Sequence, residues 1–281
     1  MERHRSLSKR IALGVVFTLW ACTPELKQTT DQASTGISDA SSTGDGVQDT
    51  SSVTTDIEPT TGGALTSCGA FSADEVKETP KFGASIADDT ALAEFEGVRC
   101  LTGGGLRIAG VSSLTPLASL ELIEGDLTIA GNPQLTTVSP LASLASIQGA
   151  LYITRNPVLA SLSGLASLVS LGGELQIGER GTNTEPDEIP ARGNDMLQDL
   201  TGLEGLHATA GITIGDNGAL GSLAGIDHLM QGTTSLVEIV NNPLLPTAAA
   251  QAFAEKVDDD GEGILVCGNM DGEPCTWIIG D

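Results

Sequence analysis

A repeat of 24 residues dominates the middle of this chain. Gly125, Gly149 and Gly173 lie 24 residues apart, and the first two begin matching stretches, GDLTIAGNP at 125–133 and GALYITRNP at 149–157. Behind each Asn-Pro pair, apolar residues follow at a strict spacing of three, as in Leu135, Val138, Leu141, Leu144 and Ile147. An α-helix would require a mixture of threes and fours, because its turn holds about 3.6 residues. A fixed period of this size, interrupted by Gly and Pro, is typical of a solenoid.

Each repeat contains a short apolar-x-apolar stretch that predicts a β-strand. There are six such stretches, at 106–108, 127–129, 151–153, 175–177, 212–214 and 237–239. Because side chains alternate along a strand, the two apolar residues point inward and the middle residue points outward. If the strands stack as a parallel sheet, the outward row is a candidate binding face. It comprises Arg107, Thr128, Tyr152, Gln176, Thr213 and Glu238.

Five asparagines fall at the same point of the repeat: Asn132, Asn156, Asn194, Asn217 and Asn242. We expect them to satisfy backbone groups of the turns from inside the coil, although a ligand-binding row is an alternative. The spacing fails once, between Asn156 and Asn194, where a polar insert of about residues 179–193 carries two prolines. Inserts in solenoids often map to a binding face, and many are tolerated surface loops.

The N-terminal segment has the features of a targeting sequence. Basic residues precede a mostly apolar run at 11–20, which is too short to span a bilayer because a span needs about 20 apolar residues. The run ends in Leu-Trp-Ala-Cys22, which resembles the lipobox of bacterial lipoproteins. The resemblance implies that 1–21 is a signal peptide and that Cys22 is the lipidated N-terminus; plain secretion is the alternative. Residues 22–67 are rich in Ser, Thr and Asp, and such a composition predicts a disordered tether.

Composition restricts the partners. The chain has a formal net charge of −24 at pH 7, which makes nucleic acid an improbable partner because phosphate backbones are repelled. A cationic partner or divalent ions remain open. The acidic stretch Asp258, Asp260 and Glu262 is similar to the start of a calcium loop, but Asn269 stands where the final Glu belongs.

Four cysteines flank the repeats. In an exported protein an even number suggests disulfides, and sequence proximity favours Cys68–Cys100 and Cys267–Cys275. Zinc is the rival interpretation, although neither pair has metal-ligand spacing. We expect each disulfide to close one end of the repeats beside a small helix, one at about 72–79 and one at 246–257.

The stretch CLTGGGLRI at 100–108, followed by repeats of Gly-x-Leu-x-Ile-x-x-Asn-x-x-Leu, resembles the receptor L domain over about residues 68–275. The resemblance implies a mainly β fold: a right-handed parallel β-solenoid of about six turns, closed by caps, within a domain at 68–281. In insulin and epidermal growth factor receptors this domain binds polypeptides. None of the receptors' contact residues can be matched in this sequence.

No catalytic motif or cofactor signature is present. The chain lacks a His-Glu-x-x-His motif, a Gly-x-Ser-x-Gly elbow and a phosphate-binding loop. We therefore expect a non-catalytic lipoprotein of the bacterial cell envelope, on the surface or facing the periplasm, which touches the membrane only through its lipid anchor. Its sheet would bind or adhere to a protein or glycan at the cell surface. The alternatives are a passive structural component of the envelope and a carbohydrate-active β-helix enzyme.

Overall fold

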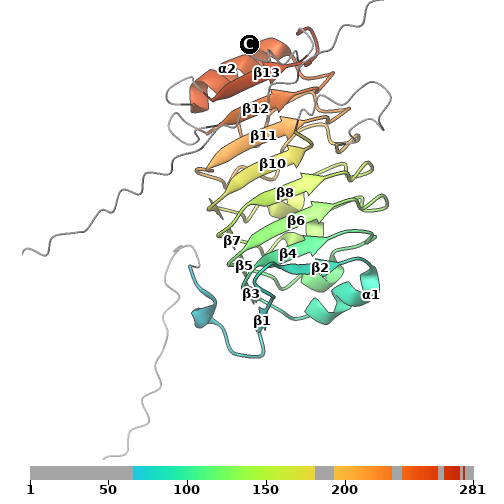
Figure 1. The fold of residues 1–281 in the computed structure, drawn as a ribbon, viewed down its shortest axis with the longest axis vertical. Coiled ribbons are helices and arrows are strands. Elements are labelled where there is room, and N and C mark those ends of the chain that lie inside the picture. Colours follow the sequence, from blue (N-terminus) through green and yellow to red (C-terminus); the bar gives the residue numbers. More distant parts are fainter. Residues whose placement is uncertain (1–65, 181–192, 230–235, 259–262, 273–274, 276–281) are drawn as a thin grey trace, which may run out of the picture. The chain divides into compact units, whose positions relative to one another are not determined.

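The computed structural model describes residues 66–180, 193–229, 236–258, 263–272 and 275, all within one compact unit, Ile57–Asp281. These residues form a mainly β structure with two open parallel sheets (Figure 1). The larger sheet has eight strands in the order β13-β12-β11-β10-β8-β6-β4-β2. Their bounds are β2 (Ala84–Ile86), β4 (Gly105–Ile108), β6 (Asp126–Ala130), β8 (Leu151–Thr154), β10 (Glu174–Gly178), β11 (Gly211–Gly215), β12 (Val237–Val240) and β13 (Ile264–Cys267).

The six strands expected from the repeats are confirmed, and their register aligns equivalent residues. Leu127 pairs with Leu151, Thr128 with Tyr152, and Tyr152 with Gln176. Two strands were missed, one at each end of the sheet. β2 lacks the Gly-x-Leu-x-Ile pattern. β13 carries part of the repeat pattern, because Asn269 follows Val266 at the same spacing at which Asn132 follows Ile129.

The second sheet was not expected from the sequence. It has five short strands in the order β1-β3-β5-β7-β9. These are β1 (Val76–Glu78), β3 (Cys100–Thr102), β5 (Leu122–Ile123), β7 (Ser146–Ile147) and β9 (Ser170–Leu171). Short 3-10 helices precede three of them: η3 (Thr115–Leu117), η4 (Ser139–Leu141) and η5 (Ser163–Leu165). A 3-10 helix has about three residues per turn, which explains the apolar spacing of three.

The inward positions of the repeats form one continuous hydrophobic core. In the repeat that begins at Gly125, all seven expected inward residues are 0–1% exposed. They are Leu127, Ile129, Leu135, Val138, Leu141, Leu144 and Ile147. Each repeat buries these side chains against its neighbours, because equivalent residues pair along both sheets.

Both disulfides have the expected local pairing, Cys68–Cys100 and Cys267–Cys275. Cys68 and Cys100 pack with Leu122 in a small cluster separate from the main core. The expected C-terminal helix is confirmed as α2 (Thr247–Val257), whose Ala250, Phe253, Ala254 and Val257 are buried. A second short helix, α1 (Asp89–Leu92), is followed at once by η2 (Ala93–Phe95), and η1 (Cys68–Ala70) contains the first disulfide cysteine.

The expected helix at 72–79 is wrong. Ser72 does cap the turn, since its N–H and hydroxyl both donate to Glu75 Oε2, at 3.0 and 2.5 Å. The chain then enters β1, because Val76 pairs with Cys100 in the five-stranded sheet. Pairing with a neighbouring strand therefore replaces the helix beyond the first turn.

Several sequence predictions concern parts of the chain outside the described residues. These are the signal peptide at 1–21, Cys22, nearly all of the tether at 22–67, and residues 181–192 of the insert. Among the described residues, no helix is long and apolar enough to cross a membrane.

Candidate functional site

The outward row of the eight-stranded sheet is accessible over only part of its length. Arg107 is exposed, and Thr128, Tyr152 and Gln176 are partly exposed. Thr213 is 0% exposed and Glu238 is 7% exposed, so the prediction that both belong to an open binding face is wrong. The accessible part of the row therefore lies on β4, β6, β8 and β10.

The buried Thr213 has a hydrogen-bond partner on the neighbouring strand. Its hydroxyl donates to Glu174 Oε1 at 2.7 Å, and Glu174 also forms an ion pair with Arg180. Burial, with a smaller contribution from the carboxylates of Glu179 and Glu238, raises the pKa of the nearby Asp216 carboxyl to about 6, so three acids lie close together at this end of the face.

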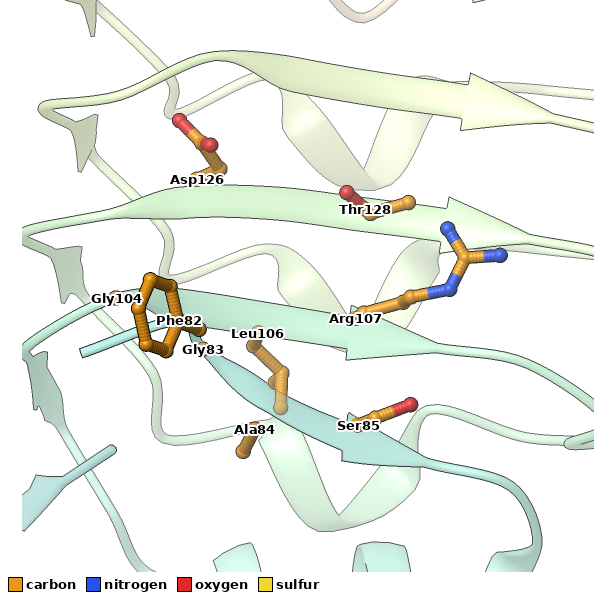
Figure 2. Close-up of a pocket in the computed structure, with 9 residues that line it drawn as sticks. All are labelled: Phe82, Gly83, Ala84, Ser85, Gly104, Leu106, Arg107, Asp126 and Thr128. Carbon is orange, nitrogen blue, oxygen red and sulfur yellow. The ribbon is translucent and has the colours of Figure 1, made fainter. Parts of the chain in front are cut away.

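Two hollows lie on the accessible part of the sheet, and Arg107 lines both of them. The first encloses about 200 Å³ between Phe82 and Asp126 on one side and Arg107 and Thr128 on the other (Figure 2). The second encloses about 390 Å³ and is lined by Arg107, Thr154, Arg155 and Glu179, among others. The guanidinium of Arg107 thus stands between two adjoining depressions.

Glycines account for the depth of the first hollow. Gly83 and Gly105 have φ values of 83° and 93°, a conformation that L side chains rarely adopt. A Cβ on Gly105 would lie 2.2 Å from the carbonyl oxygen of Asp126. Close approach of β4 and β6 therefore requires glycine, and the bare backbone forms part of the hollow's lining.

Phe82 and Arg107 are the most conspicuous groups at this site. Phe82 is 96% exposed, although burying a phenylalanine side chain is typically worth about 1.5–3 kcal/mol. The guanidinium of Arg107 makes no hydrogen bond or ion pair within the part of the chain that the structure describes. By contrast, Arg99 pairs with Glu75 and Glu121, at 2.8 and 2.6 Å, and Arg155 pairs with Glu179 at 2.7 Å.

Tyr152 lies on β8, in register with Thr128 of β6, which lines the first hollow. Burial raises the pKa of its phenol, and the carboxylates of Glu174 and Asp126 raise it further. The hydroxyl is therefore a neutral hydrogen-bond donor at any physiological pH. Of the expected face, the structure brings together four accessible residues in register, Arg107, Thr128, Tyr152 and Gln176.

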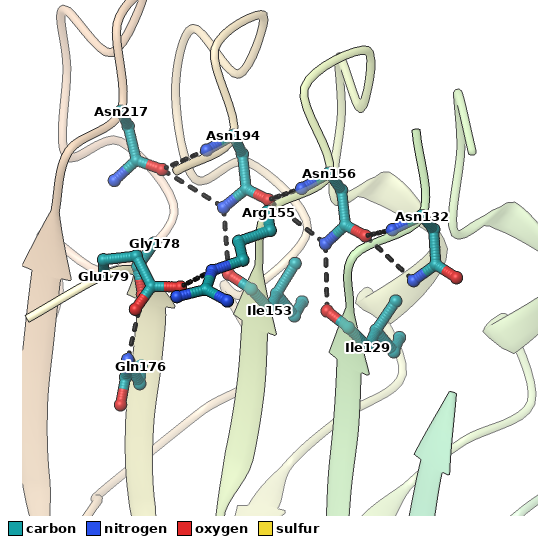
Figure 3. Close-up of polar contacts among 10 residues, drawn as sticks. All are labelled: Ile129, Asn132, Ile153, Arg155, Asn156, Gln176, Gly178, Glu179, Asn194 and Asn217. Atoms are coloured by element: carbon teal, nitrogen blue, oxygen red, sulfur yellow. Dashed lines mark hydrogen bonds and ion pairs between the residues drawn. The ribbon is translucent and has the colours of Figure 1, made fainter. Parts of the chain in front are cut away.

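The row of asparagines has internal partners, as expected for a structural role (Figure 3). Asn156 is typical: its Nδ2 donates to Ile129 O at 2.9 Å and to Asn194 Oδ1 at 3.2 Å. Its Oδ1 accepts from both the backbone N–H and the Nδ2 of Asn132. The side chain is 0% exposed. These contacts leave no amide group of Asn156 free for a ligand.

Asn269 is a sixth member of this row rather than a ligand in a calcium loop. Its Oδ1 accepts from the N–H and Nδ2 of Asn242, at 3.1 and 3.2 Å, and its Nδ2 donates to Ile239 O at 2.8 Å. Asp260 and Glu262 of the suggested loop lie outside the described residues. Within the described ranges, no three His, Cys, Asp or Glu side chains are grouped as metal ligands would be.

Sequence reasoning missed Phe82, Asp126 and Arg155 as parts of this surface. Phe82 precedes the first recognised repeat, and its only signal is a large aromatic residue placed directly before a glycine. Arg155 has a clearer signal, because it occupies the place of Gly131 in the preceding repeat with a φ of 56°. A long charged side chain at that strained position is unusual.

No family model, curated protein or solved structure matches the chain.

Proposed function

We propose that this chain is an exported bacterial lipoprotein, anchored through Cys22, whose repeats form a right-handed β-solenoid similar to the receptor L domain. Its role is non-catalytic binding or adhesion at the cell surface. Two observations support the fold. Successive repeats pair in parallel in both sheets, and equivalent asparagines follow one another from Asn132 to Asn269.

The observation that carries the binding function is the pair of hollows around Arg107. A fully exposed phenyl ring and a guanidinium without a partner among the described residues line opposite ends of one hollow, in a chain whose net charge is −24 (Figure 2). Arginine and aromatic side chains dominate the binding energy of many interfaces because they combine apolar area with directional hydrogen bonds. We therefore assign the partner to the part of the sheet that contains Phe82, Arg107 and Tyr152.

The chemistry of the lining favours binding over catalysis. The polar side chains that line the two hollows belong to Ser, Thr, Asp, Glu and Arg residues, and neither lining includes a histidine or a cysteine. Asp126 is exposed, and Glu179 is held in an ion pair with Arg155, so both carboxylates offer fixed acceptors to a ligand.

The test is a crosslinking capture from intact cells with the full-length lipidated protein. Arg107→Gln and Tyr152→Ala should each weaken capture of the partner by more than about 1 kcal/mol in apparent affinity. Lys81→Gln is the matched control. Lys81 is exposed next to Phe82 and lines neither hollow, and its replacement removes one positive charge, as Arg107→Gln does. Equal capture by all folded variants, or no specific partner for the wild type, would favour a passive structural component of the envelope instead.

A further inference from the structure

We infer that the first hollow binds a carboxylate-bearing sugar unit of an acidic glycan, with Arg107 holding the carboxylate and Phe82 stacking on the ring. This inference rests on the proposed binding function and specifies the chemical class of its ligand.

The two ends of the hollow offer different chemistry (Figure 2). At one end the phenyl ring of Phe82 presents an apolar surface beside the bare backbone of Gly83 and Gly104. At the other end lies the guanidinium of Arg107, which can only donate and whose planar fork fits a carboxylate with two parallel hydrogen bonds. A ligand that fills both ends therefore has an apolar face toward Phe82 and a carboxylate at its opposite end.

The side wall adds a requirement for hydrogen-bond donors. Asp126 accepts the N–H of Ala150 through Oδ1 at 2.8 Å, and Oδ2 has no partner among the described residues. A carboxylate can only accept, so the ligand has to donate to it. Thr128 and Ser85 contribute hydroxyls that donate or accept. A uronate-type sugar has all three features: ring C–H groups form an apolar face, hydroxyls donate, and one carboxylate accepts.

The size of the hollow also favours a single sugar ring. Its volume of about 200 Å³ is below the roughly 300–1,000 Å³ of pockets that enclose drug-sized ligands. A sugar ring also carries hydroxyls around its single carboxylate, and these can donate to the Asp126 carboxylate in the wall.

The second hollow extends the site to a neighbouring unit of the same chain. Arg155 follows β8, which is two strands from β4, so the two arginines are separated by about 10 Å along the sheet. The side chain of Arg155 is 64% exposed, although its guanidinium pairs with Glu179. Because Glu179 already offsets this charge, the second hollow adds room for a neighbouring sugar unit rather than a second carboxylate site.

The experiment titrates the purified full-length protein, in detergent, with a tetrasaccharide of galacturonate. The matched probes are a tetrasaccharide of galactose and a tetrapeptide of glutamate. The galacturonate probe should bind at least about tenfold more tightly than the galactose probe, because only the former engages Arg107 in a charge-assisted pair. Arg107→Gln should weaken galacturonate binding by about tenfold or more, and Arg107→Lys by less than that, because lysine keeps the charge without the fork.

Phe82→Ala should weaken both sugars, whereas Lys81→Gln should change neither. Equal binding of galactose and galacturonate would overturn the role of the carboxylate, and tight binding of the glutamate peptide alone would overturn the sugar class. Unchanged binding in Arg107→Gln, or no binding of any probe, would overturn the inference as a whole. The capture from intact cells, repeated with the same variants, shows separately whether the binding function itself stands.

Discussion

The side-chain amide of Asn242 donates to Oδ1 of Asn269 at 3.2 Å, although 27 residues separate the two in sequence. Both side chains are buried, at 0% and 5% exposure. The contact extends the row of asparagines beyond the last recognised repeat, to the turn that follows β13. The segment around the second disulfide is therefore a further repeat rather than a separate cap.

Asn156→Ala should lower the free energy of unfolding by about 2–4 kcal/mol. The substitution removes the acceptor of two Asn132 donors and the donor to Ile129 O; the Nδ2 of Asn132 keeps only its 3.3 Å contact with Ile108 O. Urea denaturation followed by circular dichroism measures the loss. Gln134→Ala, at an exposed position of the preceding repeat, is the control and should cost less than about 0.5 kcal/mol. Similar losses for the two variants would contradict the structural role of the row.

Removal of the two disulfides should have unequal effects. The separations of the paired cysteines are 32 residues for Cys68–Cys100 and 8 residues for Cys267–Cys275. Loop-closure entropy predicts that the longer loop stabilises the fold by about 1 kcal/mol more. Thermal unfolding of the two double Cys→Ala variants tests this difference. A larger loss at Cys267–Cys275 would show that the chain entropy of the unfolded state does not control the contribution of these disulfides.

Asp216→Asn should stabilise the protein at neutral pH. Burial raises the pKa of the Asp216 carboxyl from 3.8 to about 6, and the nearby carboxylates of Glu179 and Glu238 raise it too, against a hydrogen bond from Asn241. The folded state then binds a proton that the unfolded state releases, so the free energy of unfolding falls as pH rises from about 4 to about 6. The variant should gain about 1–2 kcal/mol at pH 7 and nothing below pH 4.

Asparagine also suits the backbone at this position, since the φ of Asp216 is 55°. Asp195→Asn, at an exposed site, provides the control for the same change in net charge. Denaturation at pH 4 and pH 7 distinguishes the variants. A gain that is independent of pH, or equal in both variants, would mean that the carboxyl of Asp216 is not the source.

The larger sheet could be predicted from the sequence because its cause is local. An apolar-x-apolar strand followed by Asn three residues later, as at Ile129 and Asn132, fixes both the inward positions and the register. The same signal was present at Val266 and Asn269, and it was obscured by the neighbouring acidic residues and cysteine. The five-stranded sheet had no such signal, because strands of two residues such as Ser146–Ile147 form only when neighbouring repeats pair.

The extent of the candidate binding face could not be predicted. Alternation does not reveal that Thr213 is fully buried or that its hydroxyl donates to Glu174, which comes from a different repeat 39 residues earlier. The hollow beside Phe82 likewise depends on the close approach of β2, β4 and β6 at glycines. Contacts between repeats, rather than the pattern within one repeat, determine what remains accessible.

Lipidation at Cys22 should be detectable by mass spectrometry of the protein extracted from membranes. The apolar run at 11–20 is too short to anchor the chain by itself, so a membrane-bound form requires the lipid. The intact mature protein should begin at an acylated Cys22, and Cys22→Ser should leave the membrane fraction. An unmodified wild-type N-terminus would contradict both the anchor and the proposed localisation.

The central claim is that the partner binds on the accessible part of the sheet around Arg107. The most direct measurement is photocrosslinking in intact cells from single residues replaced by a photoreactive amino acid. Thr128 lines the first hollow, whereas Thr201 is exposed and lines neither hollow. The account predicts a specific crosslinked product from position 128 that is absent from position 201 and is lost when Arg107→Gln is added. Crosslinking from position 201 alone, or from position 128 regardless of Arg107, would contradict it.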